Sequence, residues 1–372
     1  MKIAFIGQKG IPAKTGGVEK YVESLATNLI ALGHEVFVYS RRDYLPEKLV
    51  EFKGVKIINL PSFCGKNLEA ISHTFLAVLD LIFRKVDVIH FQSIGPASLM
   101  WLVKLLKPNT PIVFTFHCQD YYHQKWGAFA RAYLRFGEMV GCRLANKIIV
   151  ISKELAEYVP REYRREVTYI PNGASVIEKT PVREIRRWGL EGNDYFVYIG
   201  RLVRHKGIQY LIKAYKRLKT DKKLVIVGEG AYTDDYVSEL HALAEGNNNI
   251  IFTGNQTGRN LAELFSNAYV FVQPSESEGL SIALLEAMSY RTACLVSDIR
   301  ANLEAVGNTG LVFANKDIDD LHIKMQFAVD NPEVITAKAD EGRERVRREF
   351  NWEDITKKVA GVYEGVLKYQ TK

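Results

Sequence analysis

The sequence is poor in cysteine and has no long apolar run, and each shortage excludes a class of protein. Its 372 residues include four cysteines, none of them in a C-x-x-C pair, so the spacing supports neither a disulfide framework nor a zinc site. A reducing cytoplasm is therefore the expected compartment. Because no run reaches about 18 apolar residues, we expect no membrane-spanning helix. Met1 and Lys2 lead straight into a strand, so we expect no signal peptide.

The chain also lacks the markers of dinucleotide and nucleic-acid binding. The glycine loop after the first predicted strand is not G-x-G-x-x-G, and Arg41 and Arg42 stand where an acidic residue would bind a ribose. This argues against NAD and leaves an NADP oxidoreductase as one alternative. The net charge of +7 suits anionic partners such as sugar nucleotides or acidic lipid headgroups. Without an arginine-rich arm or a nucleic-acid motif, we expect no nucleic acid partner.

What is present is a regular alternation of apolar strand and helix patterns in both halves of the chain. Apolar residues make up 47% and charged residues 25%, values typical of a globular protein of two domains. The alternation predicts an α/β protein with two Rossmann-like domains. A polar stretch at 174–193 predicts the boundary, so we expect domains at 1–178 and 179–351. Strands are predicted at 2–7, 35–39, 55–60, 86–91, 112–116, 147–151, 167–170, 195–200, 223–228, 249–253, 269–272, 293–297 and 311–313.

One stretch of the second half combines two carboxylates with a helix start. The apolar run 268–274 predicts a buried strand and 281–290 a helix, which places Glu278 in the loop between them and Glu286 inside the helix. A helix N-terminus suits a phosphate, and carboxylates accept hydrogen bonds from hydroxyls, so the stretch suits a nucleotide-activated sugar. The alternative is an ordinary strand-turn-helix unit. The amides at the helix start belong to Gly279, Leu280 and Ser281.

A second stretch of the same half places two cations just beyond a strand. Arg201 and Lys206 follow the predicted strand 195–200 and precede a helix predicted at 208–218. An arginine fork and a lysine ammonium both suit a diphosphate. The alternative is a pair of ordinary surface cations.

These motifs resemble those of family 4 glycosyltransferases of the GT-B fold. The resemblance rests on Gly200-Arg201-Leu202, on Lys206-Gly207 and on the spacing of Glu278 and Glu286, and it extends beyond residue 313. The stretch 10–19 is closest to the bacterial rhamnosyltransferase-like branch. The resemblance implies a retaining, metal-independent transfer from a nucleotide-diphosphate sugar to a glycan or lipid-linked acceptor in cell-surface polysaccharide synthesis. It implies no cofactor, and a final helix, 352–372, that crosses back to the first domain.

The resemblance also assigns roles to individual residues. Glu286 would bind the ribose, Glu278 the donor sugar, and Gly16-Gly17 would face the donor phosphates. The implied catalytic residues are His117, Glu278, Arg201 and Lys206. The implied donor-binding residues are Gly16, Gly17, Arg201, Lys206, Glu278, Gly279, Leu280, Ser281 and Glu286. The candidates for an acceptor surface, or equally for core, are Asp120, Tyr121, Tyr122 and Trp126.

Several other interpretations stay open at this point. A non-catalytic nucleotide-sugar binder of the same fold is the alternative function. A metal site could form from His117, Cys118, Asp120 and His123, although the spacing matches no known metal motif. The apolar helices predicted at 67–83 and 95–106 are interpreted as core, and a second interpretation places the end 102–107 on the inner face of a membrane.

Two local features also follow from the sequence. The pair Asp317 and Asp319 forms a D-x-D, which we interpret as a helix cap and not as a manganese site. The family's glycine and proline after Glu286 are replaced by Arg291 and Ala293, so we expect Arg291 in a left-handed conformation, at a cost of about 1 kcal/mol. Leu280-Ser281 replaces an aromatic-glycine pair, which is expected to alter the pocket for the donor sugar.

Overall fold

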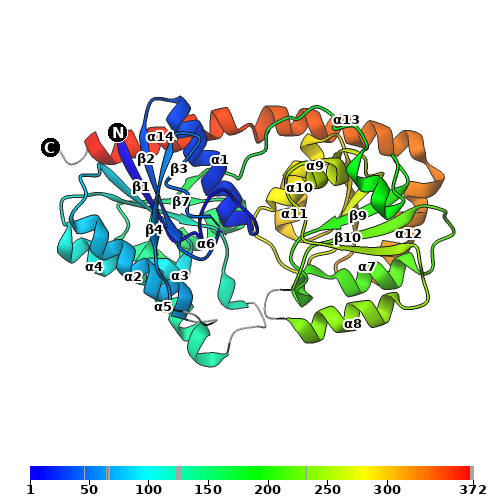
Figure 1. Ribbon diagram of the computed structural model, residues 1–372, viewed down its shortest axis with the longest axis horizontal. Coiled ribbons are helices and arrows are strands. Elements are labelled where there is room, and N and C mark those ends of the chain that lie inside the picture. The colour runs from blue at the N-terminus through cyan, green and yellow to red at the C-terminus, as the bar shows by residue number, and fades with distance from the viewer. Residues whose placement is uncertain (46, 64, 66–67, 123–126, 231–232, 369–372) are drawn as a thin grey trace. The chain divides into compact units, whose positions relative to one another are not determined.

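The computed structural model describes residues 1–45, 47–63, 65, 68–122, 127–230 and 233–368 (Figure 1). The chain forms two compact units, one made of Met1–Asn172 with the C-terminal residues from Trp352 onward, the other of Gly173–Asn351. The division falls in a segment without helix or strand that also contains the expected boundary at 178/179. Each unit is a parallel α/β layer structure, which confirms the prediction of two Rossmann-like domains.

The first unit contains a sheet of order β3-β4-β2-β1-β5-β6-β7-β8, in which β3 alone runs antiparallel to its neighbour. Both faces of the sheet are buried, because Ile3 and Phe5 point to one side and Ala4 and Ile6 to the other. The strands are β1 (Lys2–Ile6), β2 (Glu35–Arg41), β3 (Glu51–Phe52), β4 (Val55–Leu60), β5 (Val88–Gln92), β6 (Ile112–Phe116), β7 (Lys147–Val150) and β8 (Thr168–Tyr169).

Helices cover both faces of this sheet. The face of Ala4 and Ile6 packs against α2 to α6, and α1 lies against α14 over the other face (Figure 1). The predicted helix 95–106 is instead two helices. The helical segments are α1 (Gly17–Ala31), α2 (Leu68–Ile82), α3 (Ile94–Ala97), α4 (Met100–Leu106), the 3-10 turn η1 (Asp120–Tyr122), α5 (Ala128–Leu144), α6 (Lys153–Tyr163) and α14 (Trp352–Lys368).

A buried histidine ties the C-terminal helix to the first sheet. The imidazole of His90 lies 2.7 Å from the hydroxyl of Tyr363 through Nδ1 and 2.7 Å from that of Thr115 through Nε2. Burial lowers the pKa of His90 to about 3, so the ring is neutral at physiological pH. A neutral ring with two hydroxyl partners is fully satisfied, which is why a polar group is tolerated at this position in the core.

The second unit has an all-parallel sheet of order β11-β10-β9-β12-β13-β14. One face packs against α7, α8 and α12. The strands are β9 (Tyr195–Ile199), β10 (Lys223–Val227), β11 (Ile250–Gly254), β12 (Val270–Gln273), β13 (Ala293–Ser297) and β14 (Leu311–Phe313). The helical segments are η2 (Glu184–Trp188), η3 (Arg204–Lys206), α7 (Ile208–Tyr215), α8 (Asp234–Ala244), α9 (Gly258–Ser266), α10 (Ile282–Ser289), α11 (Arg300–Val306), α12 (Ile318–Asp330) and α13 (Pro332–Glu349).

Two local expectations are confirmed in this unit. Asp317 caps α12, its carboxylate accepting hydrogen bonds from the backbone N–H groups of Asp319 and Asp320. Arg291 ends α10 with a positive φ of 63°. Its guanidinium pairs with the carboxylate of Asp340 on α13, with 2.7 Å between Nη2 and Oδ2. This ion pair accompanies the strained conformation where the family has glycine.

The polar segment 174–193 is more ordered than its composition suggests, because a buried glutamate organises it. Glu263 of α9 accepts hydrogen bonds at Oε2 from the backbone N–H groups of Arg183, Glu184 and Ile185, at 2.8, 2.7 and 3.3 Å. Burial alone would raise the pKa of this carboxyl, but Arg259 and the three N–H groups hold it below its usual value. The carboxylate thus supplies the hydrogen-bond acceptor for the backbone N–H groups at the start of η2, although it lies 78 to 80 residues away in the chain.

We predict that Glu263→Ala lowers the free energy of unfolding by about 2–4 kcal/mol at pH 7, because three backbone donors and Arg259 lose a buried acceptor. Glu245→Ala, at an exposed glutamate of the same unit, is the matched control and should change stability by less than about 0.5 kcal/mol. Because the pKa of Glu263 is lowered in the folded state, its contribution should disappear as pH falls through that value. Urea unfolding at two pH values measures the loss of stability and its dependence on pH. If Glu263→Ala and Glu245→Ala lost the same free energy of unfolding, Glu263 would not have the proposed structural role.

Candidate functional site

In the second unit, the carboxyl ends of β9 and β12 are neighbours and bring the two predicted motifs together. Gly207 (φ 73°) lies so close to the loop after β12 that a Cβ would be 1.9 Å from the carbonyl oxygen of Pro274. The backbone N–H of Glu276 donates to the carbonyl of His205 at 2.7 Å. Glycine is therefore required after Lys206, because only a residue without a side chain permits this approach.

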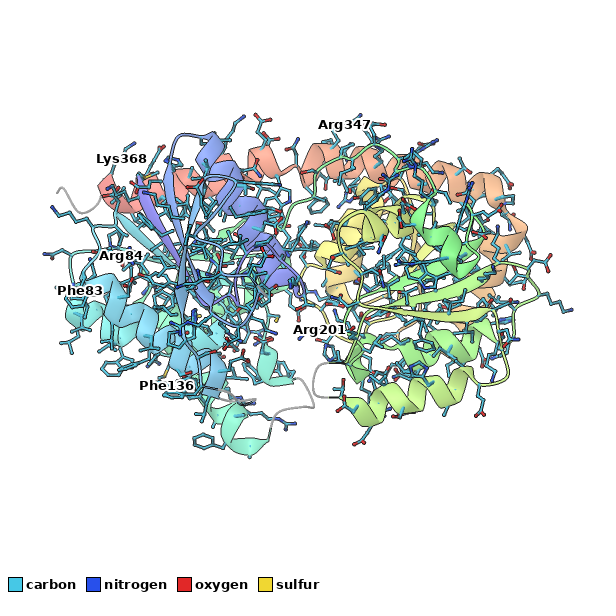
Figure 2. The ribbon with its side chains drawn as sticks, viewed as in Figure 1. Phe83, Arg84, Phe136, Arg201, Arg347 and Lys368 are labelled. Carbon is cyan, nitrogen blue, oxygen red and sulfur yellow. The ribbon has the colours of Figure 1, made fainter. Side chains whose placement is uncertain are left out.

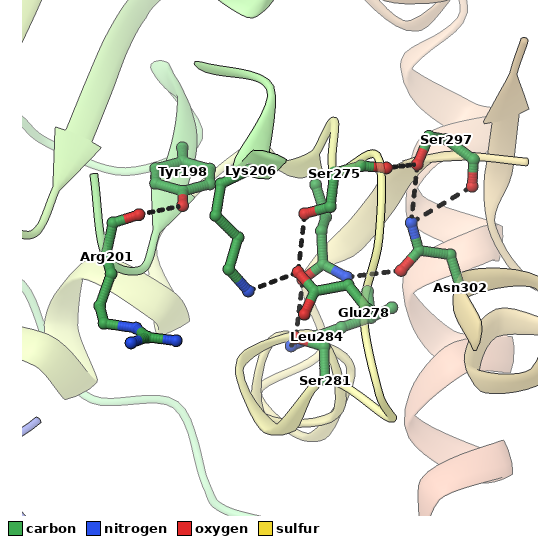
Figure 3. A network of polar contacts seen from close by, with 10 residues as sticks. Tyr198, Arg201, Lys206, Ser275, Glu278, Ser281, Leu284, Ser297 and Asn302 are labelled. Atoms are coloured by element: carbon green, nitrogen blue, oxygen red, sulfur yellow. Dashed lines mark hydrogen bonds and ion pairs between the residues drawn. The ribbon is translucent and has the colours of Figure 1, made fainter. Parts of the chain in front are cut away.

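The contact between the loops places Lys206 directly against Glu278. Nζ of Lys206 is 2.5 Å from Oε1 of Glu278, and both side chains are largely buried, with 17% and 9% of their surface exposed. The hydroxyl of Ser275 donates to the same carboxylate oxygen at 2.7 Å (Figure 3). The two residues predicted to bind the diphosphate and the sugar are thus ion partners here, which spacing in the sequence could not show.

Arg201 contributes a second positive charge at this edge of the sheet. Its backbone carbonyl accepts a hydrogen bond from the hydroxyl of Tyr198 at 3.0 Å, which holds the main chain of the loop (Figure 3). Its side chain is exposed, and within the described part of the chain the guanidinium has no ion-pair partner. As far as the described residues go, Arg201 is therefore a cation that can reach an anionic ligand without first breaking an ion pair.

The start of α10 is capped by Ser281, whose hydroxyl oxygen accepts a hydrogen bond from the backbone N–H of Leu284 at 3.3 Å. The same hydroxyl donates to Oε1 of Gln273 at 2.7 Å, so it faces the protein interior. Leu280 is also buried. Ser281 therefore joins the start of α10 to the end of β12.

Behind the loop runs a chain of buried hydrogen bonds, which we call the polar relay. Gln273 donates from Nε2 to Oδ1 of Asn302 at 2.6 Å, and Asn302 donates from Nδ2 to the hydroxyl of Ser297 at 2.9 Å. Ser297 in turn donates to the carbonyl of Ser275 at 2.5 Å (Figure 3). The donor and the acceptor of each hydrogen bond are determined by its neighbours. The relay holds the loop that carries Glu278 at Ser275 before this residue and at Ser281 after it. The relay consists of Gln273, Ser275, Ser281, Ser297 and Asn302.

Glu286 lies more than one turn into α10 and is partly buried. Its charge acts together with burial, which is the larger cause, to raise the pKa of Tyr290 to about 12. Glu286 is thus carried by the helix whose N-terminus Ser281 caps.

In the first unit, His117 follows β6 and is buried. Its Nε2 lies 2.8 Å from Oε1 of Gln92 at the end of β5, and the ring of Tyr21 meets it edge-on at 5.0 Å. Burial lowers the pKa of His117 to about 4. The imidazole is therefore neutral near pH 7, and it can exchange hydrogen bonds with a hydroxyl but adds no positive charge.

The glycine loop of the first unit is held by an acidic residue of α1. Gly16 (φ 99°) precedes the helix, and a Cβ there would lie 2.1 Å from Oε2 of Glu19. Glu19 is buried and accepts a hydrogen bond from the backbone N–H of Lys9 at 2.9 Å. Gly17, by contrast, has open space where a Cβ would be. Gly16 is required by the packing of the loop, whereas Gly17 leaves the start of the helix accessible.

The predicted acceptor residues that the structure describes, Asp120, Tyr121 and Tyr122, form the 3-10 turn η1 and differ in exposure. Asp120 accepts a hydrogen bond from the thiol of Cys118 at 3.1 Å. Tyr121 is buried, as the core interpretation expects, and Arg135 lies 5.2 Å above its ring. Tyr122 is 65% exposed, whereas Trp126 lies outside the described residues.

The alternative metal site includes His123, which also falls outside the described residues. In the rest of the chain, as far as the structure describes it, no group of three or more His, Cys, Asp or Glu side chains could hold a metal ion. The residues that the sequence did not single out are Tyr21, Gln92, Gln273, Ser297 and Asn302. Gln92, Gln273 and Ser297 end strands, whereas Tyr21 and Asn302 lie in α1 and α11, and ordinary polar residues at such positions have no distinguishing spacing.

We predict that Ser281→Ala destabilises the start of α10 by about 2 kcal/mol or more, since it removes a cap and leaves Gln273 Oε1 without its donor. Ser152→Ala is the matched control, because Ser152 caps α6 in the same way through Leu155 N–H at 3.3 Å and should cost about 1 kcal/mol. Amide hydrogen exchange at Leu284 and Leu155 measures each helix start locally. Equal losses of protection would show that the relay adds nothing to the cap.

Comparison with known families assigns both units. Residues 15–176 match the family described as Glycosyltransferase Family 4, and residues 183–347 match Glycosyl transferases group 1. An uncharacterized glycosyltransferase of Methanocaldococcus jannaschii is 26% identical over 98% of both chains. The alpha-maltose-1-phosphate synthase of Mycobacterium tuberculosis is 32% identical, over 62% of this chain and 65% of that protein. The alpha-monoglucosyldiacylglycerol synthase of Streptococcus pneumoniae is 25% identical, over 75% of this chain and 67% of that protein.

Solved structures agree on the fold. Sucrose-phosphate synthase from Thermosynechococcus elongatus has a TM-score of 0.85 at 23% identity and covers 99% of both chains. Anabaena HepE in complex with UDP and glucose has a TM-score of 0.83 at 18% identity, over 98% of this chain and 100% of that one. Both matched families and the fold lead to one assignment: this chain is a glycosyltransferase of the GT-B fold, with a family 4 domain followed by a group 1 domain.

Proposed function

We propose that this glycosyltransferase moves a sugar from a nucleoside-diphosphate sugar, of the UDP-glucose type, to a glycan or lipid-linked acceptor, with retention of configuration and without a metal ion. The observation that carries the proposal is the Lys206–Glu278 pair beside the start of α10. A cation and a carboxylate in contact suit a ligand with a phosphate joined to a hydroxyl-rich ring. Similarity to a protein that binds UDP and glucose supports the choice of donor.

The positive groups of the second unit would take the diphosphate. The exposed guanidinium of Arg201, the ammonium of Lys206 and the amides around Gly279 all lie in the loops after β9 and β12. Negative charge grows on the diphosphate as its bond to the sugar breaks, and fixed cations and amides stabilise such charge most in the transition state. This arrangement would supply the role that a metal ion plays in other transferases, so we propose a metal-independent reaction and no cofactor.

Glu278 would then bind the donor sugar. When Lys206 turns to the diphosphate, Oε1 of Glu278 loses its ammonium partner and becomes an acceptor for sugar hydroxyls, while Ser275 keeps its place. Glu286 would bind the ribose hydroxyls. The neutral imidazole of His117 would orient the sugar without adding charge. Gly16 and Gly17 are proposed to face the phosphates.

We propose that retention arises from attack on the face that the diphosphate leaves. The bond between the anomeric carbon and the diphosphate oxygen breaks, the acceptor oxygen bonds to that carbon, and the acceptor proton passes to the departing diphosphate oxygen. Glu278 is occupied with binding, so no covalent sugar-enzyme intermediate is required. Atoms and charge balance with donor and acceptor alone.

The acceptor class is proposed from the relatives and the resemblance of the sequence. Relatives include a glycogen synthase and a synthase of a glucosyl glycolipid, which supports a role in polysaccharide or glycolipid synthesis. Similarity of the stretch 10–19 to the rhamnosyltransferase-like branch supports a cell-surface polysaccharide made in the cytoplasm. Tyr122 would offer an exposed aromatic face to a sugar.

We expect Lys206→Ala to weaken the binding of both UDP and UDP-glucose by about tenfold to a hundredfold, the cost of one charge-assisted hydrogen bond. Titration calorimetry in EDTA measures both affinities, and Lys213→Ala, at an exposed lysine of α7, is the control. If wild-type protein binds neither UDP-, GDP- nor dTDP-sugars, the proposed donor class is wrong. Binding without any transfer or hydrolysis would favour the non-catalytic alternative.

Glu278→Gln should affect the binding of the sugar and of the nucleotide differently. Because the substitution removes the competing charge beside Lys206, the affinity for UDP should stay equal or rise. The affinity for UDP-glucose relative to UDP should fall by about tenfold, since the sugar hydroxyls lose an ionised acceptor. The same titrations give this ratio. An unchanged ratio would place the sugar away from Glu278 and contradict its proposed role.

A further inference from the structure

Helix α2 of the first unit has two apolar sides, and only one of them is in the core. Its buried side packs on the sheet through Ala77, Val78 and Leu81. Its outer side also carries large apolar residues at intervals of seven, which is one stripe along a helix. The interpretation of this whole helix as core was therefore wrong, because the outer stripe faces solvent. The exposed members of the stripe are Leu68, Phe75 and Ile82.

Large apolar side chains are also exposed directly after α2 and on two neighbouring helices. Phe83, directly after α2, is 87% exposed, and α4 exposes Trp101 and Leu105, the latter by 69%. Phe129 and Phe136, seven residues apart on α5, are also exposed, Phe129 by 86%. Helix α4 contacts both α2 and α5, and all three helices pack on the same face of the sheet, so they form one layer of the unit.

We call this side the outer apolar face. Figure 2 labels two of its members, Phe83 and Phe136, which project from the same layer of helices. Its members are Leu68, Phe75, Ile82, Phe83, Trp101, Leu105, Phe129 and Phe136.

The second unit shows that this exposure is unusual for the same fold. Among its described residues, the large apolar side chains that are exposed are Ile177, Leu303, Ile323 and Phe327. Scattered apolar residues of this kind are normal on any soluble domain, whereas many large apolar side chains exposed on neighbouring helices of one layer indicate an interaction surface. The outer apolar face is therefore expected to bind a partner.

The charge around the face identifies the kind of partner. The acidic residues of α2 are already paired, Glu69 with Arg41 and Asp80 with Arg84. Basic residues are numerous on the same helices and their connections, and an aromatic and aliphatic surface bordered by lysine and arginine suits the interface of an anionic bilayer. The exposed basic residues are Lys85, Arg131, Arg135 and Arg143.

We propose that the outer apolar face docks this protein on an anionic lipid bilayer. The three helices would lie flat, with their apolar side chains about 5–10 Å deep at the boundary of headgroups and acyl chains. The basic side chains would reach the headgroups, as long cationic side chains do at interfaces. Among the described residues no helix is long and apolar enough to cross a membrane, so the contact is peripheral. The proposal does not depend on which sugar donor is bound.

The test is co-sedimentation of the full chain with vesicles of phosphatidylcholine alone and of phosphatidylcholine with about 30% phosphatidylglycerol. Binding is expected to the anionic vesicles only, and it should weaken as salt rises. A triple variant, Phe83→Ser with Leu105→Ser and Phe129→Ser, should bind at least about tenfold less. Since all three side chains are exposed, its thermal stability should match that of wild type.

Two matched controls separate this face from general effects. Ile323→Ser with Phe327→Ser removes exposed apolar side chains from the second unit and should leave vesicle binding unchanged. Lys85→Glu with Arg131→Glu should weaken binding, whereas Lys179→Glu with Lys213→Glu should weaken it much less at equal change in net charge. UDP-glucose binding by the triple variant should equal that of wild type, so failure of the donor proposal and failure of this one are distinguishable.

Three outcomes would overturn the proposal. Wild-type protein that does not sediment with anionic vesicles at low salt has no such docking surface. A triple variant that sediments as well as wild type places the membrane contact elsewhere. Sedimentation velocity that shows a dimer, lost in the triple variant while vesicle binding is absent, would assign the face to a second copy of the chain.

Discussion

The site of the second unit depends on one close approach, that of Gly207 to the carbonyl of Pro274. Parallel strands end at the same edge of a sheet, so the loops after β9 and β12 start as neighbours. Here the missing Cβ lets the loop after β9 rest on the loop after β12. The approach is what brings Lys206 into contact with Glu278, and so joins two charges that lie 72 residues apart in the chain.

The contact would be loose without the polar relay behind it. A loop with a largely buried lysine–glutamate pair must keep the ammonium and the carboxylate in contact, because a buried charge that loses its partner is strongly destabilising. Gln273, Asn302 and Ser297 do this with amide and hydroxyl groups whose directions are all determined by their neighbours. The same network reaches the cap of α10 through Ser281, so the helix start and the ion pair are positioned by one set of bonds.

The two units use the same architecture with different outer surfaces. In both, helices cover the two faces of a mainly parallel sheet, and each sheet has its own closed core. In the first unit the helices α2, α4 and α5 keep apolar and basic side chains on the outside as well. The fold does not require these side chains, since the second unit is built without them. They are therefore better explained by a partner than by stability.

The sequence by itself determined the class of the fold and most of the strands. It also placed Arg201, Lys206 and Glu278 in loops after strands and Glu286 inside a helix, because strand-end position and charge are visible in local order. It also indicated the cap at Asp317 and the left-handed Arg291, since both depend on neighbouring residues. The organisation of 174–193 by Glu263, the ion pair of Lys206 with Glu278 and the polar relay were decided by the tertiary structure alone. The outer stripe of α2 belongs with them, because apolar periodicity marks a helix face but not whether another layer covers it. Each of these features depends on the packing of segments that are distant in the chain. Packing brings the partners of Glu263, Lys206 and the polar relay within hydrogen-bond distance, and it leaves the outer stripe of α2 without a covering layer.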